Sequence, residues 1–147
     1  MSPQGNSTLG TVFGYNDLIT SFTELSIFEG VTSLATDAFR DCSYLVAITL
    51  REGLLTMARS FYSCSHLPII TIPSTMTALG NDPFYNCIRL ATIIALPTSP
   101  PTVSGTWLRY NSIAKIYVPD NSVSAYKAAS GWSTYASRIH GMSEYEG

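Results

Sequence analysis

The chain has 147 residues, of which 46% are hydrophobic and 12% charged, so it can bury one continuous core, and disorder along its whole length is disfavoured. Eight Lys and Arg against ten Asp and Glu give a formal net charge of -2 without any basic block, which argues against a nucleic-acid partner. No apolar run approaches the ~18 residues of a membrane span, and the opening MSPQGNSTLG shows no secretory signal. We therefore expect one domain without membrane insertion.

Residues 1–21 are predicted to form a polar N-terminus and an N-terminal cap. Up to about Thr8 the residues are small and polar, and an apolar set follows. That set consists of Val12, Phe13, Tyr15, Leu18, Ile19 and Phe22. It shows no clean copy of the motif that dominates the rest of the chain, so we expect it to cover an open end of the core.

A seven-residue motif, Phe-x-x-Cys-x-x-Leu, recurs along the chain, and we call it the corner motif. Its copies are FRDCSYL at 39–45, FYSCSHL at 61–67, FYNCIRL at 84–90 and an eroded WLRYNSI at 107–113. In the eroded copy Trp, Tyr and Ile stand for Phe, Cys and Leu. Residues at i, i+3 and i+6 share one side of a tight helical or 3₁₀ turn, so the motif predicts a repeated, inward-facing corner.

The three cysteines recur once per repeat, at positions 42, 64 and 87. This spacing is not a C-x-x-C pair, and no second ligand accompanies any of them at short range. We interpret Cys42, Cys64 and Cys87 as reduced, buried, small apolar groups, with a disulfide bridge or a metal site as the alternative. No cofactor is expected.

A short alternating segment follows each corner motif, and one more precedes the first copy; each predicts a strand with one buried face. The inward pairs are Leu25 and Ile27, Ile48 and Leu50, Ile70 and Ile72, Ile93 and Ala95, and Ile116 and Val118. Because successive pairs lie 22 or 23 residues apart, we expect five parallel strands stacked in one sheet across residues 22–118.

A second apolar pair follows each of the first three strands and predicts an opposite wall. The pairs are Val31 and Leu34, Leu54 and Met57, and Met76 and Leu79. The next turn contains Pro97, Pro100 and Pro101, which cannot donate ladder hydrogen bonds. We therefore expect the opposite wall to end there.

Residues 119–142 are predicted to form a C-terminal cap, and residues 143–147 a frayed tail. Asp120, Asn121 or Ser122 can begin a short helix that Gly131 ends. Large side chains follow, namely Tyr126, Trp132, Tyr135 and Ile139. We expect them to lie over the last coil and hide its edge, because an exposed parallel strand invites further pairing.

These features predict a repeat solenoid of about five coils, with a parallel sheet on one face, short 3₁₀ corners on the other and a small helical cap. Residues Phe22 to Ile139 resemble the BspA-like leucine-rich repeats of bacterial surface proteins. The resemblance rests on the AF-x-x-C-x-x-L segment at 38–45, on ITIP at 70–73 and on the ending IYVPDNSVSAYKAASGWSTYASRI. The departures are Ser60 and Pro83 before Phe, and Trp107. The resemblance implies adhesion or protein recognition at a bacterial or phage surface.

No constellation of polar residues indicates catalysis. A nucleophile with a base and an orienting group is absent from the pattern, and His66 occupies an outward position of its corner motif. Asp37, Asp41 and Asp82 recur near the corners without the spacing of a calcium loop, so turn formation is their expected role. We expect a protein that is not an enzyme.

The outward face of the sheet carries the candidate binding residues, because stacked strands align equivalent positions into ladders. The ladders are Ser26, Thr49, Thr71, Ile94 and Tyr117; Phe28, Arg51, Pro73, Leu96 and Pro119; and Glu24, Ala47, Ile69, Thr92 and Lys115. From these we select Phe28, Thr49, Arg51, Ile69, Thr71, Ile94, Leu96, Lys115 and Tyr117 as candidate partner-binding residues. The apolar members are expected to form an exposed patch. Three alternatives remain for what contacts these apolar residues: a partner, a second copy of the chain, or another part of the same chain.

Two functions remain open from the sequence. The first is a recognition or adhesion module that binds a protein or a glycan through the sheet face, as a domain of a larger surface protein. The second is a structural subunit of a phage virion or another assembly, in which the same ladders mediate self-association into a homo-oligomer.

Overall fold

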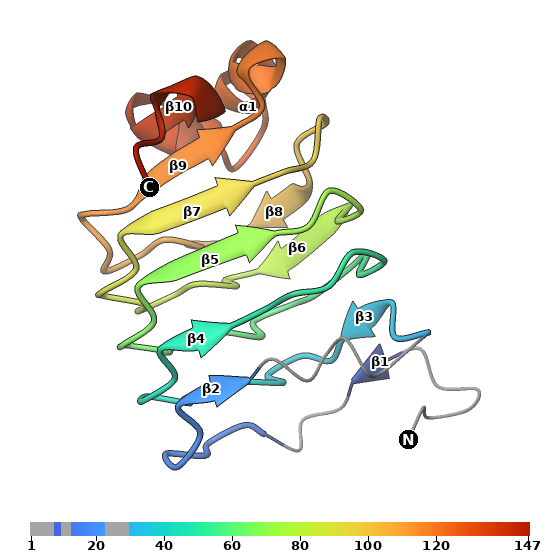
Figure 1. Ribbon diagram of the computed structural model, residues 1–147, viewed down its shortest axis with the longest axis vertical. Helices are drawn as coiled ribbons and strands as arrows, with labels where there is room; N and C mark the ends of the chain where they lie inside the picture. The colour runs from blue at the N-terminus through green and yellow to red at the C-terminus, as the bar shows by residue number, and fades with distance from the viewer. Residues whose placement is uncertain (1–7, 10–12, 23–29) are drawn as a thin grey trace.

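The computed structural model of the protein describes residues 8–9, 13–22 and 30–147. The strands form two rows, one on each side of the molecule, and within each row they lie one above another (Figure 1). The chain passes from one row to the other and back, and we call each such pass a coil. The buried side chains fill the space between the two rows.

The first row, called the sheet face, consists of parallel strands. They are β2 (Ser21–Phe22), β4 (Ala47–Ile48), β5 (Ile69–Ile72), β7 (Thr92–Ala95), β9 (Lys115–Val118) and β10 (Ile139–Gly141). The order β5-β7-β9-β10 forms a four-stranded sheet, and β2 pairs with β4 separately. The predicted inward residues Ile70, Ile72, Ile93, Ile116 and Val118 are buried, as the alternation indicated.

The sheet face is divided between β4 and β5, which corrects the expectation of one continuous sheet. No ladder joins these two strands in the part of the chain that the structure describes. In neighbouring coils, Val46 donates its N–H to the Thr20 carbonyl, and Ala91 donates to the Pro68 carbonyl. Pro68 occupies the equivalent position before β5 and has no N–H to donate, so the first bond of that ladder cannot form.

The second row, called the back wall, also consists of parallel strands. They are β1 (Thr8–Leu9), β3 (Ser33–Leu34), β6 (Ala78–Asn81) and β8 (Thr102–Ser104), with single bridges through Thr56 between β3 and β6. The predicted inward pairs from Val31 to Leu79 are all buried.

The back wall does not end at the proline-rich segment, so that expectation is wrong. β8 follows the prolines and pairs with β6 in parallel. The three prolines lie before the strand, and Thr102 donates the N–H that the pairing needs to the Thr77 carbonyl, 3.0 Å away. The prolines therefore lie in the connection between the sheet face and the back wall and leave the strand pairing of both intact.

The corner motifs place their Phe, Cys and Leu side chains in the core, where all of them are fully buried in the copies at 39–45, 61–67 and 84–90. Each motif contains two successive turns, in which Cys donates to the Phe carbonyl and Leu donates to the Cys carbonyl. At the third residue of the first turn, Asp41, Ser63 and Asn86 adopt positive φ values of 56°, 60° and 60°. The first turn of each corner therefore has a left-handed third residue, as a type II turn does, and Asn and Asp tolerate this conformation better than most residues with a side chain.

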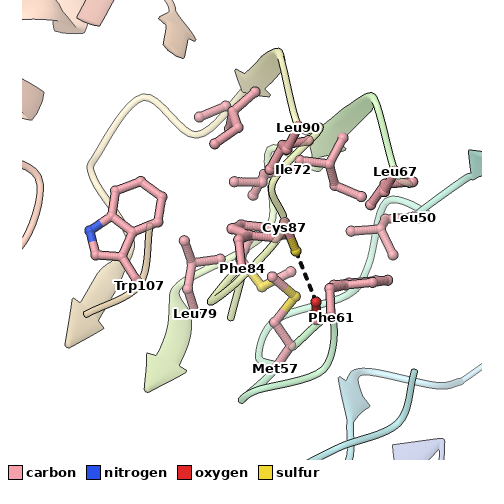
Figure 2. Packing of buried hydrophobic residues seen from close by; sticks show 14 of the residues in the cluster. Leu50, Met57, Phe61, Leu67, Ile72, Leu79, Phe84, Cys87, Leu90 and Trp107 are labelled. Carbon is pink, nitrogen blue, oxygen red and sulfur yellow. Dashed lines mark hydrogen bonds between the residues drawn. The ribbon is translucent and has the colours of Figure 1, made fainter. Parts of the chain in front are cut away.

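The aromatic rings of successive corners form one continuous column. Neighbouring ring centroids lie 5.4 Å apart for Phe13–Phe39, 5.5 Å for Phe39–Phe61, 6.0 Å for Phe61–Phe84, 6.4 Å for Phe84–Trp107 and 4.9 Å for Trp107–Trp132. Figure 2 shows Phe61, Phe84 and Trp107 with the aliphatic side chains that surround them. Stacked or tilted aromatic pairs at these distances add stabilisation beyond the burial of their area.

The column begins earlier than the sequence indicated. Phe13 stacks on Phe39 with ring planes 6° apart, and Tyr15 has the left-handed φ of 62° found at Asp41 in the next corner. Phe13-x-x-Asn16-x-x-Ile19 is therefore a corner, with Asn for Cys and Ile for Leu. It escaped detection because this coil is longer: β2 pairs Phe22 with Ile48, 26 residues on. The predicted pair Leu25 and Ile27 lies outside the described residues.

The corner at Trp107 uses different residues from those expected. Tyr110 and Ile113, predicted to replace Cys and Leu, are 60% and 52% exposed, whereas Asn111 and Ala114 are buried. The Asn111 amide donates to the carbonyls of Cys87 and Leu90, at 2.8 Å and 2.7 Å. The sequence did not predict Asn there because an inward corner position was expected to be apolar, but the Asn111 side chain satisfies backbone carbonyls in the corner below.

The C-terminal residues form short helices and a further strand. The helices are η2 (Asp120–Ser122), α1 (Val123–Ala128), η3 (Ser133–Arg138) and η4 (Met142–Glu144). β10 pairs with β9 in parallel, Ile139 opposite Ile116, so the open edge of β9 is covered by an added strand. The expected frayed tail also makes contacts, because the Tyr145 ring lies 4.9 Å from the ring of Tyr117.

Candidate binding surface

The outward residues of the sheet face form ladders with the predicted register. Thr71, Ile94, Tyr117 and His140 are successive partners across β5, β7, β9 and β10. Ile69, Thr92 and Lys115 form the neighbouring ladder. Thr49 follows β4, below the division of the sheet, and Phe28 lies outside the described residues.

The candidate residues differ in exposure. Thr49, Thr71 and Lys115 are exposed, and Ile69 is 38% exposed. Arg51, Ile94 and Leu96 are half-buried, whereas Tyr117 is only 8% exposed. The face is therefore a mixed polar and apolar surface rather than the broad apolar patch that the sequence predicted.

Tyr117 is buried because the end of the chain lies over it. Its ring centroid is 5.7 Å from that of His140 and 4.9 Å from that of Tyr145. The sequence did not reveal this cover, because β10 and the turn after it carry no copy of the repeat pattern. Intramolecular cover, one of the three alternatives for the ladder, thus applies at this position.

Two open clefts flank the covered tyrosine. The larger, about 470 Å³, is lined by residues of β7 and β9 and by the last residues of the chain, including Lys115, Tyr145 and Glu146. The smaller, about 250 Å³, adds His140 and Glu144, whose Nδ1 and Oε2 atoms lie 3.7 Å apart. These clefts combine one cation with carboxylates at the upper end of the sheet face.

A second surface lies on the outer side of the corners, and the sequence pattern did not single it out. Tyr62 and Tyr85 stack with ring centroids 4.5 Å apart and planes at 8°, and Tyr85 meets Tyr110 edge-on at 5.4 Å. The guanidinium of Arg40 lies 4.5 Å from the centre of the Tyr62 ring. The signal was present in the variable positions of the corner motif, because five of these twelve positions in the copies at 39–45, 61–67 and 84–90 hold Arg or Tyr.

The cysteines are free and buried, and each also makes a directed contact. The thiols of Cys42, Cys64 and Cys87 donate to the carbonyls of Phe13, Phe39 and Phe61 in the coil below, at 2.9 to 3.1 Å. Figure 2 shows the last of these bonds.

Burial raises the pKa of the Cys64 thiol well above its usual range and that of Cys87 to about 12. Neutral thiols are poor nucleophiles and poor metal ligands, so the row of cysteines joins coils rather than reacting.

Polar side chains near the corners contact backbone groups or each other and stabilise the turns. Asp37 adopts a φ of 67° and pairs with Arg59 at 3.0 Å, and Asp82 accepts the Thr106 N–H. His66 Nδ1 lies 2.6 Å from the Ser43 carbonyl. Across residues 8–9, 13–22 and 30–147, no group of three or more His, Cys, Asp or Glu is placed to hold a metal ion.

The parallel rows of strands and the stacked corners define a repeat protein. A family model for the BspA type leucine-rich repeat region matches residues 14–130 in six copies. The chain therefore belongs to the BspA-type leucine-rich repeat family. No curated protein matches it. In the part of the chain that the structure describes, no helix has the length and apolarity to cross a membrane.

Proposed function

We propose that the protein is a non-enzymatic leucine-rich-repeat solenoid that recognises a protein or glycan partner through its sheet face. Membership of the leucine-rich repeat family supports a protein-interaction module, and repeats of this family are typically non-catalytic. BspA-type repeats are often associated with surfaces, which favours display at the surface of a cell or a virion.

The observation that carries the proposal is the register of β5, β7 and β9. Ile69 and Thr71 stand opposite Thr92 and Ile94, and these stand opposite Lys115 and Tyr117. Backbone pairing holds this grid of outward side chains in place before any partner arrives. A preformed surface loses little conformational entropy on binding, so its contacts contribute more of their energy to affinity.

The experiment begins by selecting peptide ligands from a displayed random library and glycan ligands from an array. The affinity of the best ligand is then measured for Ile69→Asp, Thr71→Arg and Lys115→Glu. We expect each substitution to weaken binding about tenfold, because Ile69→Asp and Thr71→Arg bring an unpaired charge into the contact and Lys115→Glu reverses one. Tyr117 is left unchanged, because it is buried and a substitution there would change the stability of the protein as well as its affinity for the ligand.

Leu55→Asp is the matched control, because Leu55 is 42% exposed and its N–H bonds to the Thr32 carbonyl on the back wall. This variant should bind as the parent does, and all four variants should melt within a few degrees of it. Equal binding by the sheet-face variants and Leu55→Asp would reject the sheet face. A closed oligomer in sedimentation that Ile69→Asp dissociates would instead favour the structural-subunit function.

A further inference from the structure

Exposed apolar side chains gather on the outer side of the corners rather than on the sheet face. At the corners of Phe84 and Trp107 the structure exposes 49% of Ile88, 60% of Tyr110 and 52% of Ile113. Arg89 and Arg109 are exposed in the same two corners. We call the surface formed by Tyr85, Ile88, Arg89, Arg109, Tyr110 and Ile113 the basic corner. It joins large apolar groups to two guanidinium groups.

The aromatic part of the basic corner is already ordered. Tyr85 is held between the stacked ring of Tyr62, 4.5 Å away, and the perpendicular ring of Tyr110, 5.4 Å away. A side-chain hydrogen bond with Tyr110 raises the pKa of Tyr85. Rigid tyrosines provide contact area with little loss of rotamer entropy, a property of many binding hot spots.

The charges differ along the row of corners. At the N-terminal side, Arg40 pairs with Asp37 and Asp41, and Arg59 pairs with Asp37. At the basic corner, Arg109 lies 5.2 Å from the centre of the Tyr110 ring. No carboxylate of the described residues pairs with Arg89 or Arg109. In a chain of net charge -2, these two cations are left for an external anion.

We propose that the basic corner is a second docking surface, whose partner is a protein segment that carries carboxylates. Two guanidiniums can each bind a carboxylate in two-pronged geometry, and the exposed apolar side chains of the same two corners can bury the rest of the segment. A glycan fits less well, because Tyr62 and Tyr85 cover one face of each other, Arg40 lies over the Tyr62 ring and Tyr110 lies edge-on to Tyr85, which leaves little open ring face for a sugar. Two arginines are also too few to follow a phosphate backbone.

The test uses an array of short synthetic peptides, in which each sequence rich in Asp and Glu has a twin with Asn and Gln. The intact protein should prefer acidic peptides over their amide twins by about tenfold or more. The double variant Arg89→Gln/Arg109→Gln should lose that preference. Charge reversal, Arg89→Glu/Arg109→Glu, should transfer it to peptides rich in Lys.

Matched controls separate this surface from general charge and from the sheet face. Lys127→Gln removes one exposed cation from α1, and Tyr44→Ser removes an exposed tyrosine from another corner; both should keep the preference. Tyr110→Ser should reduce it while the thermal unfolding midpoint stays within a few degrees.

Equal binding of acidic peptides and their twins would overturn the proposal, as would loss of acidic-peptide binding in Lys127→Gln. Binding of neutral oligosaccharides that Tyr110→Ser abolishes would overturn it in favour of a glycan. The sheet-face variant Ile69→Asp should keep the acidic preference, so this proposal and the proposed function fail separately.

Discussion

The two ends of the repeat array close the core in different ways. At the C-terminal end, Trp107, Tyr126 and Trp132 are fully buried. Their polar tips donate to backbone carbonyls: Trp107 to Gly131 at 2.9 Å, Tyr126 to Pro97 at 2.7 Å and Trp132 to Pro101 at 2.8 Å. At the other end, Phe13 is half-buried and β2 has two residues.

The difference shows what closing a stack of coils requires. An apolar ring covers the core but leaves the carbonyls of the last coil without donors. Indole and phenol groups cover the core and also donate to these carbonyls, because one end of the side chain is apolar and the other carries an N–H or O–H. Among the described residues of the N-terminal end, the rings packed on the core are Phe13 and Phe22, which have no polar tip, and Tyr15 and Leu18 are 67% and 90% exposed. We expect the array to unfold from this end.

The largest effect should come from the middle of the ring column. Phe61→Ala removes a fully buried ring between Phe39 and Phe84 and should lower the free energy of unfolding by about 3 to 5 kcal/mol. Phe13→Ala, at the half-buried end, should cost clearly less. Urea unfolding followed by circular dichroism measures both, and equal costs would contradict the proposed difference between the interior and the N-terminal end.

Removing one hydroxyl at the C-terminal end should have an intermediate effect. Tyr126→Phe keeps the buried ring but leaves the Pro97 carbonyl without its donor, which should cost about 1 to 3 kcal/mol. Tyr44→Phe is the control, because Tyr44 is 53% exposed and water can replace its partner. If the two variants unfold at the same urea concentration, the hydrogen bond of Tyr126 does not stabilise the C-terminal end, and the proposed difference between the two ends fails.

The cysteine row predicts a loss of stability at alkaline pH. The pKa of Cys87 is about 12 in the folded protein against an ordinary value of 9.0. Below pH 9.0 its contribution is fully present, and it is lost progressively as pH rises toward 12, because the unfolded chain releases the proton first. Urea midpoints between pH 7 and 11 should fall, and Cys87→Ala should flatten the curve. Cys42→Ala, nearer the N-terminal end, should reduce the pH dependence of the urea midpoint less than Cys87→Ala does. If the parent and Cys87→Ala lose stability equally between pH 7 and 11, the Cys87 thiol does not cause the loss.

The smallest effect is expected from the ion pair of Asp37 and Arg59 on the surface of the N-terminal half. Asp37→Asn keeps the left-handed conformation and removes the charge, so the free energy of unfolding should change by less than about 1 kcal/mol. A thermal melt in low and high salt measures this, and the difference should vanish in high salt. A larger, salt-independent loss would mean that the N-terminal half depends on this pair.

Much of the fold followed from the sequence because its period constrains it. The corner copies at 39, 61 and 84 placed nine core side chains correctly, and the alternation after the corners at 61, 84 and 107 predicted the register of β5, β7 and β9. The belief that every coil has the same length hid the corner at Phe13, whose coil is 26 residues long. The assumption that the core is uniformly apolar hid Asn111.

The candidate surface was less predictable than the fold. Register follows from local alternation, but exposure depends on contacts with distant residues, such as the cover of Tyr117 by Tyr145. The row of Tyr62, Tyr85 and Tyr110 was not predictable, because the sequence does not show which variable positions of successive corners contact each other. The choice of Ile69, Thr71 and Lys115 as binding residues stays a prediction, as do the segment boundaries drawn at residues 21, 118 and 142.

The missing ladder at Pro68 has a mechanical consequence. Stacked coils behave as springs in series, and the softest contact determines how far the whole array bends. Between β4 and β5 the sheet face lacks its hydrogen bonds, while the rings of Phe39 and Phe61 and the bridges of Thr56 remain behind it. Under tension the molecule should flex at this seam, opening on the sheet face and pivoting on the ring column.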